Sequence, residues 1–313
     1  MVSPGTTNPV TLAKGAAPTA AHTETQVFTR LLRGLLAGLA LTLLHLAPAN
    51  AQKVLNVGLV PAEDPRLVVS DNQAMLDQLS TSLGMQVKPF VATDYNGVIE
   101  ALRAKRLDIA LLGPFSYVLA TSIAPVEAFV IPETQKQGPS YHAYIIARKD
   151  RNIRSVADLK GKTFAFVDPS STSGHLFPKA GLIKAGFDPD NDFSRVIFSG
   201  GHDASAIAVQ NGKVDAGAVA DALLESAIAR GMVKQDEIAI VWKSPPIPGA
   251  PFVMRTDLPE PLKKRLRAAF AQQKDLPWGP NATIKRWVPV DDSHFDVVRD
   301  TARLLKLDIK KLK

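Results

Sequence analysis

Residues 164–186 read Phe-Ala-Phe-Val-Asp-Pro-Ser-Ser-Thr-Ser-Gly-His-Leu-Phe-Pro-Lys-Ala-Gly-Leu-Ile-Lys-Ala-Gly. The apolar run 164–167 predicts a buried strand, Asp168-Pro169 predicts a turn, and residues 176–185 have helical spacing that ends at Gly186. The small residues between these elements therefore stand where a strand is followed by a helix. This is the basic unit of an α/β fold.

The polar residues at this junction are Ser171, Thr172 and Ser173. The first backbone N–H groups of a helix have no partner within the helix, and the helix dipole makes that end positive. The free N–H groups at the start of this helix and the three hydroxyl groups together predict a site for an anion with several oxygens. The alternative is that these residues only cap the helix, because serine and threonine are preferred caps.

The rest of the chain continues the alternation of strands and helices. Strands are expected at 54–60, 87–91 and 108–112, and helices at 67–83, 97–105 and from 115 onward. Such alternation predicts a parallel or mostly parallel sheet with helices on both faces and ligands at the strand ends. Residues 113–117 are one such end.

Two polar or proline-rich passages divide the chain into lobes. Residues 149–152 and 244–249 are predicted as paired crossings between two α/β lobes, with the ligand between them. The first lobe comprises residues 52–148 and 247–313, including amphipathic helices at 261–272 and 294–305. The second comprises residues 149–246.

The N-terminus predicts export. Arg30 and Arg33 precede an uncharged run at 34–47, and Pro48-Ala49-Asn50-Ala51 has the small-x-small form of a secretory cleavage site. The run is shorter than the roughly 20 residues of a membrane-spanning helix. We therefore expect a signal peptide at 1–51 and a mature periplasmic chain without a transmembrane segment.

Composition and motifs narrow the class of protein. The chain has 313 residues, 46% of them hydrophobic, a net charge of +7 and no cysteine. The mild positive charge suits anionic ligands, but no clustered basic stripe predicts nucleic-acid binding. The patterns of phosphate loops, serine hydrolases, zinc proteases and dinucleotide sites are absent. The six histidines lack metal-ligand spacing, so we expect no metal or cofactor.

A second strand-to-helix turn, residues 199–205, reads Ser-Gly-Gly-His-Asp-Ala-Ser. Its glycines let backbone N–H groups approach a ligand closely, and His202 could donate to an anion. A lone histidine is more often a capping or packing residue. Two such turns in one lobe favour the binding interpretation.

Four motifs together resemble the periplasmic phosphonate and phosphite binding proteins of ABC transporters. They are residues 93–101 (Thr-Asp-Tyr-Asn-Gly-Val-Ile-Glu-Ala), 168–174 (Asp-Pro-Ser-Ser-Thr-Ser-Gly), 201–209 (Gly-His-Asp-Ala-Ser-Ala-Ile-Ala-Val) and 242–249 (Trp-Lys-Ser-Pro-Pro-Ile-Pro-Gly). The resemblance covers nearly all of the mature chain. It implies a type II periplasmic-binding-protein fold, with two α/β lobes joined by a two-strand hinge that closes on the ligand.

The resemblance also implies a function. The chain would be a monomeric binding protein that delivers a small phosphorus oxyanion to an ABC transporter permease and performs no chemistry. The oxyanion would be held by Ser171, Thr172, Ser173 and His202, with Tyr95 and Tyr141.

One departure from the family bears on the choice of ligand. Aminoalkylphosphonate binders carry two acids where this chain has Ala222 and Ala250, so a ligand ammonium would lack its partner unless Asp221 supplies it. Phe115 and Tyr117 are candidates for an apolar wall against a small substituent. These residues predict phosphite or methylphosphonate as better ligands than 2-aminoethylphosphonate.

Two other functions stay open at this point. A sulfonate or another oxyanion could be the cargo. An exported hydrolase could instead use His202 with Asp203 or Asp221 as its acid.

Overall fold

The computed structural model describes residues 53–307 and residue 309. They belong to one compact unit, Gln52–Lys313. The predicted signal peptide, residues 1–51, lies outside the described residues. Within the described part of the chain, no helix combines the length and apolar character that crossing a membrane requires.

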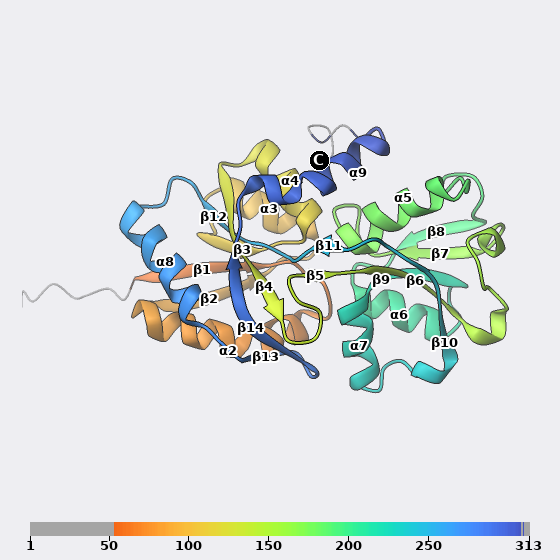
Figure 1. The fold of residues 1–313 in the computed structure, drawn as a ribbon, viewed down its shortest axis with the longest axis horizontal. Coiled ribbons are helices and arrows are strands. Elements are labelled where there is room, and N and C mark those ends of the chain that lie inside the picture. Colours follow the sequence, from red (N-terminus) through yellow and green to blue (C-terminus); the bar gives the residue numbers. More distant parts are fainter. Residues whose placement is uncertain (1–52, 308, 310–313) are drawn as a thin grey trace, which may run out of the picture. The chain divides into compact units, whose positions relative to one another are not determined.

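The first lobe is built on a seven-stranded sheet with the strand order β13-β14-β4-β12-β3-β1-β2 (Figure 1). Its strands are β1 (Val54–Leu59), β2 (Gln86–Val91), β3 (Ile109–Leu111), β4 (Val126–Thr134), β12 (Phe252–Arg255), β13 (Leu276–Trp278) and β14 (Ala282–Pro289). Its helices are α2 (Pro65–Leu83), α3 (Tyr95–Arg103), α4 (Pro114–Ile123), α8 (Glu260–Gln272) and α9 (Asp296–Leu304), the last preceded by the 3-10 turn η5 (Asp292–Phe295).

Local sequence signals explain where α2 begins and ends. The Asp64 carboxylate accepts the N–H of Arg66 at 2.9 Å, and Pro65 takes the first helical position, where no N–H is needed. Gly84 ends the helix in the left-handed conformation with φ 57°, which glycine adopts without steric cost. Helix α2 thus returns the chain to the end of the sheet where β1 begins, and β2 then pairs parallel with β1.

Helices cover both faces of this sheet. Buried side chains of α2 and α8 pack with those of β1 on one face, and those of α3, α4 and α9 pack on the other. The C-terminal helices therefore return to the first lobe, as predicted. The alternating βα segments place the ends of β1 and β3 at one edge, toward the second lobe (Figure 1).

The second lobe contains a five-stranded sheet with the order β10-β6-β9-β7-β8. Its strands are β6 (Ala143–Arg148), β7 (Thr163–Phe166), β8 (Arg195–Phe198), β9 (Ala216–Ala220) and β10 (Ile238–Lys243). Its helices are the π-helical turn η3 (Thr172–Leu176), α5 (Phe177–Lys184), α6 (His202–Gln210) and α7 (Asp221–Ala229), with short 3-10 turns η1 (Lys149–Arg151), η2 (Ala157–Leu159) and η4 (Gln235–Glu237).

Both sheets are mixed rather than mostly parallel, which corrects the expectation from the sequence. Parallel pairing joins β1 to β2 and β3, and β7 to β8 and β9. The strands next to the crossings, β4, β6, β10 and β12, pair antiparallel with their neighbours in the sheets. Of these four strands, β12 and β6 run opposite to the parallel strands of their sheets, because each receives the chain directly from a crossing rather than through a βαβ unit.

The two crossings form a small sheet of their own. The strand β5 (Ser140–Tyr141) pairs antiparallel with β11 (Ile247–Pro248) between the lobes (Figure 1). The second crossing lies within the predicted segment 244–249. The first does not lie at 149–152, because β6 already belongs to the second sheet. The first boundary of the predicted division therefore moves back to the segment around β5.

Candidate functional site

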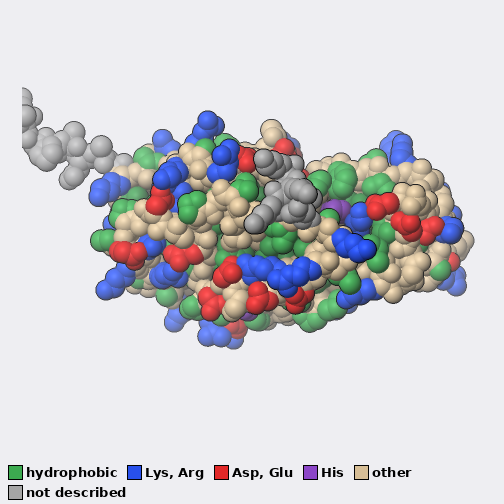
Figure 2. Space-filling model, turned by 90° about the horizontal axis from the view of Figure 1, so that it is seen from above, with side chains coloured by type: hydrophobic (Ala, Val, Ile, Leu, Met, Phe, Trp, Pro, Cys, Tyr) green, Lys and Arg blue, Asp and Glu red, His purple; other side chains and the backbone are tan. Residues whose placement is uncertain are grey.

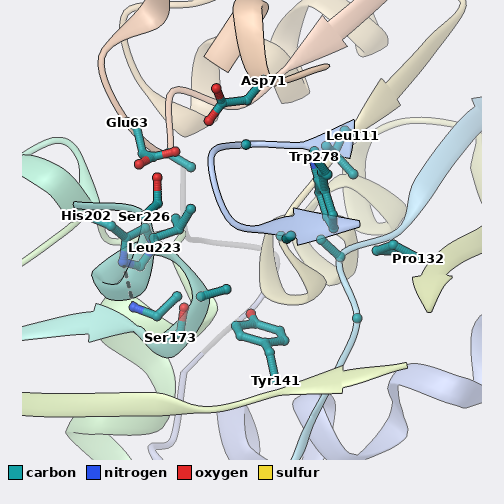
Figure 3. A pocket seen from close by; sticks show the side chains of 18 of the residues that line it. Glu63, Asp71, Leu111, Pro132, Tyr141, Ser173, His202, Leu223, Ser226 and Trp278 are labelled. Carbon is teal, nitrogen blue, oxygen red and sulfur yellow. Dashed lines mark hydrogen bonds between the residues drawn. The ribbon is translucent and has the colours of Figure 1, made fainter. Parts of the chain in front are cut away.

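A cavity of about 220 Å³ lies between the lobes, lined by residues of both (Figure 3). Six of the nine predicted site residues line it: Tyr95, Tyr141, Ser171, Thr172, Ser173 and His202. They come from the first lobe, the first crossing and two strand-to-helix turns of the second lobe. The crossings and the turns thus converge on one space.

The serine-rich turn is held in place by its own backbone and by a glycine. Ser171 Oγ accepts the N–H of Gly174 at 3.0 Å, and the N–H of Leu176 reaches the carbonyl of Ser171 at 3.0 Å. A β-carbon on Gly174 would lie 2.3 Å from Cβ of Val167, so only glycine fits against the end of β7. The turn is π-helical, a form often found at functional sites.

The three hydroxyl residues of this turn are almost completely buried, between 1% and 3% exposed. Ser171 is a true cap, as the alternative interpretation proposed, but the cap bond uses only the acceptor capacity of its oxygen and not its hydroxyl hydrogen. Thr172 Oγ1 accepts the backbone N–H of Phe115 from the first lobe at 2.8 Å. Close by, Ser116 Oγ donates to the carbonyl of Ser170 at 2.9 Å. The turn therefore also connects the lobes.

The predicted apolar wall of Phe115 and Tyr117 is wrong. Both residues are buried in the first lobe and neither lines the cavity. The Tyr117 hydroxyl donates to the Asp292 carboxylate at 2.7 Å, and its ring packs edge-on against Phe295. Helix α4 turns the Tyr117 side chain toward η5, before α9, and Phe115 contacts the serine-rich turn through its backbone N–H.

Two tyrosines, the buried Tyr95 and the partly buried Tyr141, face the serine-rich turn. Burial raises the pKa of Tyr95 well above its usual range, partly offset by a hydrogen bond with Ser171. Burial likewise raises the pKa of Tyr141 to about 12, partly offset by hydrogen bonds with Ser173 and Thr172. Both phenols stay neutral at physiological pH, so each provides a hydroxyl donor.

His202 is 3% exposed at the start of α6. Its Nδ1 accepts the backbone N–H of Ala220 at 3.0 Å, so the ring proton of the neutral imidazole is on Nε2. Burial lowers the pKa of His202 to about 3. The residue therefore offers one neutral N–H donor.

We expect the His202 imidazole to remain neutral between about pH 9 and pH 5. Histidine-selective NMR of the unliganded protein would follow its ring resonances, with His202→Gln to assign them. A midpoint between pH 6 and 7 would contradict the buried tautomer.

The unfolded chain takes up this proton near its ordinary pKa of 6.5 and the folded chain does not, so His202 makes the fold less stable as the pH falls from 6.5 toward 3.

Asp221 does not reach the cavity. It is 2% exposed, and its Oδ1 accepts the N–H of Ala222 at 2.8 Å at the start of α7. Burial raises its pKa, while hydrogen bonds from the backbone favour the carboxylate. Ala222 and Ala250 do line the cavity, so the two positions where the family carries acids face the ligand space.

The sequence analysis missed Glu63, an acid that lines the cavity from the first lobe (Figure 3). It follows β1 in the proline-rich loop 61–65. The available signal was its place after the carboxyl end of a parallel strand, where ligands bind in α/β sheets. Asp71 of α2 also lines the cavity and is paired with Arg230 of the second lobe at 2.5 and 2.7 Å.

Charged donors contribute little to this space. Among the described residues that line the cavity, Lys136 is the one lysine or arginine, and its Nζ lies 2.6 Å from the carboxylate of Glu225. Within the described part of the chain, no group of three or more histidine, aspartate or glutamate residues is arranged for a metal ion. An anion bound here would be held by neutral hydroxyl and N–H groups.

Comparisons with known proteins agree with this geometry. Residues 57–295 match the family model described as "ABC transporter, phosphonate, periplasmic substrate-binding protein". The chain is 34% identical to the phosphate-import protein PhnD of Mycolicibacterium smegmatis, covering 79% of this chain and 84% of that protein. It is 32% identical to the phosphonates-binding periplasmic protein of Escherichia coli, covering 78% and 74%.

Solved structures have the same fold. A binding protein component of an ABC phosphonate transporter from Pseudomonas aeruginosa is 30% identical with a TM-score of 0.74, covering 80% of this chain and 85% of that chain. PhnD1 of Prochlorococcus marinus in complex with methylphosphonate is 23% identical with a TM-score of 0.71, covering 82% and 99%.

Proposed function

This chain belongs to the periplasmic substrate-binding proteins of phosphonate ABC transporters, and we propose that it captures a small phosphorus oxyanion such as phosphite, methylphosphonate or a related phosphonate. The observation that carries the proposal is the convergence of six neutral donor residues on one buried cavity between two lobes. Its relatives are named for phosphate and phosphonates.

The donor set suits a tetrahedral oxyanion. Three hydroxyls from one turn, two phenols and one imidazole N–H approach from different elements, and each oxygen of a phosphonate accepts more than one hydrogen bond. Each bond to a charged group contributes roughly 1.5 to 3 kcal/mol. Several together hold an anion without a lysine or arginine in contact.

The hydrolase alternative is less well supported by the contacts of His202. In a Ser-His-Asp arrangement, a carboxylate accepts a hydrogen bond from the imidazole and orients it. Nδ1 of His202 instead accepts from Ala220, and the Asp203 carboxylate accepts the backbone N–H groups of Asp64 at 2.8 Å and Ala204 at 2.7 Å. We propose that the ligand is released unchanged, which recovery of intact methylphosphonate after incubation would test.

Membership of the family supports a proposal for the partner and the location. We propose that the mature chain is a periplasmic monomer that presents its ligand to an ABC transporter permease. The face shown in Figure 2 mixes Lys and Arg with Asp and Glu side chains.

A thermal-shift panel tests the proposed function. We expect phosphite, methylphosphonate or a longer phosphonate to raise the melting temperature, and sulfonates of the same shape to do so far less. Ligand at a hundredfold excess over Kd adds about 2.7 kcal/mol of stability, which such a panel detects. No shift with any phosphorus compound, including phosphate, would refute the proposal, and a larger shift with sulfonates would reassign the ligand.

A further inference from the structure

Glu63 is a buried acid without a hydrogen-bond partner at one of its oxygens. It is 7% exposed, it lines the cavity, and within the described residues Oε1 has no partner. In Figure 3 it lies on the side of the cavity away from Tyr141 and Ser173. A buried polar atom left unpaired costs about 1 to 3 kcal/mol, and more when charged. The position therefore suits a group that arrives with the ligand.

The charges around Glu63 are unbalanced. Asp71 on α2 and Asp203 at the start of α6 both act on it, with Arg230 following α7 as the cation and the Ser226 hydroxyl of α7 nearby. Arg230 is already paired with Asp71. Tyr95 on α3, also close enough to sense Glu63, is neutral. Three carboxylates thus share one guanidinium, and the vicinity of Glu63 favours an added positive charge.

The cavity has room to reach Glu63 from the serine-rich turn. The cavity has a volume of about 220 Å³, and both the serine-rich turn and Glu63 line it. Ala222, Leu223, Ala250 and Trp278 contribute apolar lining, which suits a short carbon chain.

We propose that Glu63 is a second binding residue of this cleft, which accepts a hydrogen bond from a donor, above all a cationic one, on the carbon substituent of the bound oxyanion. This inference rests on the proposed function and names a specificity residue within it. It replaces the preference expected from Ala222 and Ala250, since Glu63 supplies an acid to the cavity that those two positions lack.

Protonation is consistent with this role. Burial, followed by the charges of Asp71 and Asp203, raises the pKa of Glu63 to about 7. An ammonium ligand would favour the carboxylate, whereas methylphosphonate leaves it unpaired. The preference for an ammonium ligand is therefore larger at pH 8 than at pH 5.5, where Glu63 is protonated.

Isothermal titration calorimetry at pH 8 tests the proposal with matched ligands. 2-Aminoethylphosphonate and n-propylphosphonate have the same shape, and they differ in an ammonium replacing a methyl group. We expect the wild-type chain to bind 2-aminoethylphosphonate at least tenfold more tightly than n-propylphosphonate. The hydroxyl group of 2-hydroxyethylphosphonate should raise the affinity over that of ethylphosphonate by a smaller factor. In Glu63→Gln the tenfold preference falls to threefold or less, while n-propylphosphonate binds at least as well as before.

The control variant is Glu225→Gln, which removes a carboxylate from the same cavity that is already paired with Lys136. It should keep most of the preference. Tighter binding of n-propylphosphonate than of 2-aminoethylphosphonate by the wild-type chain would by itself overturn the proposal. The proposal would also fail if Glu63→Gln kept the full preference for 2-aminoethylphosphonate, or if Glu225→Gln lost as much of it as Glu63→Gln. Failure of every phosphonate to bind would instead refute the proposed function.

Discussion

Replacing Ser171 and Ser173 together by alanine is expected to weaken methylphosphonate binding at least a hundredfold. Each change removes a hydroxyl donor to a charged oxygen, worth about 1.5 kcal/mol or more. Two such losses give about 3 kcal/mol, and each 1.4 kcal/mol is tenfold in Kd. Titration calorimetry measures the loss directly. Thr172 is left unchanged because its hydroxyl also bonds the first lobe.

The fold should change much less than the affinity. Only Ser171 caps the turn, and the loss of a cap costs about 1 kcal/mol of unfolding free energy. Asp291→Ala is the matched control, because it removes the cap of η5 in the part of the first lobe that holds α9. It should reduce stability similarly and leave the affinity unchanged. If the double variant lost stability but kept its affinity, the serines would be caps alone.

Gly174→Ala is expected to have an equally large effect on binding without removing any donor. The added methyl group would lie 2.3 Å from Cβ and 2.4 Å from Cγ2 of Val167, so the turn must move away from β7. Such overpacking costs about 1 to 3 kcal/mol of stability. Because the hydroxyls of Ser171, Thr172 and Ser173 all belong to this turn and would move with it, the affinity for methylphosphonate should fall about a hundredfold.

The control for this prediction is Gly186→Ala, after α5. Its φ of 80° disfavours alanine, but the methyl group would point into open space. It should therefore lower the melting temperature and leave binding intact. Comparable affinity losses in both glycine variants would show that reduced stability, rather than displacement of the turn, governs binding.

The two turns that line the cavity were predictable because their signal is local. Ser171, Ser173 and His202 stand where a strand changes to a helix, and that boundary is visible in hydrophobic spacing. The αβ alternation likewise predicted the lobes. The first crossing was misplaced because the two-residue strand Ser140–Tyr141 has no periodicity to detect, whereas the polar segment at 149–152 looks like a linker.

The remaining errors concern the direction of side chains in three dimensions. Phe115 and Tyr117 were correctly placed at a strand end. The spacing of residues along α4 does not show, however, whether the side of the helix that carries Tyr117 packs against the α9 region or faces the cavity. Asp221 and Glu63 both follow strands, so their positions in the sequence do not distinguish them. Only the packing of the lobes leaves one bound to its own backbone and the other facing the cavity.

The bond between Thr172 Oγ1 and the Phe115 N–H gives closure and binding a common component. Any interaction that makes closure of the lobes more favourable then also makes ligand binding more favourable. By thermodynamic reciprocity, the bound ligand favours closure to the same extent. Conversely, a membrane partner that binds the open form more tightly must weaken ligand binding by that ratio. Under the proposed function, docking that opens the lobes would therefore promote release of the ligand.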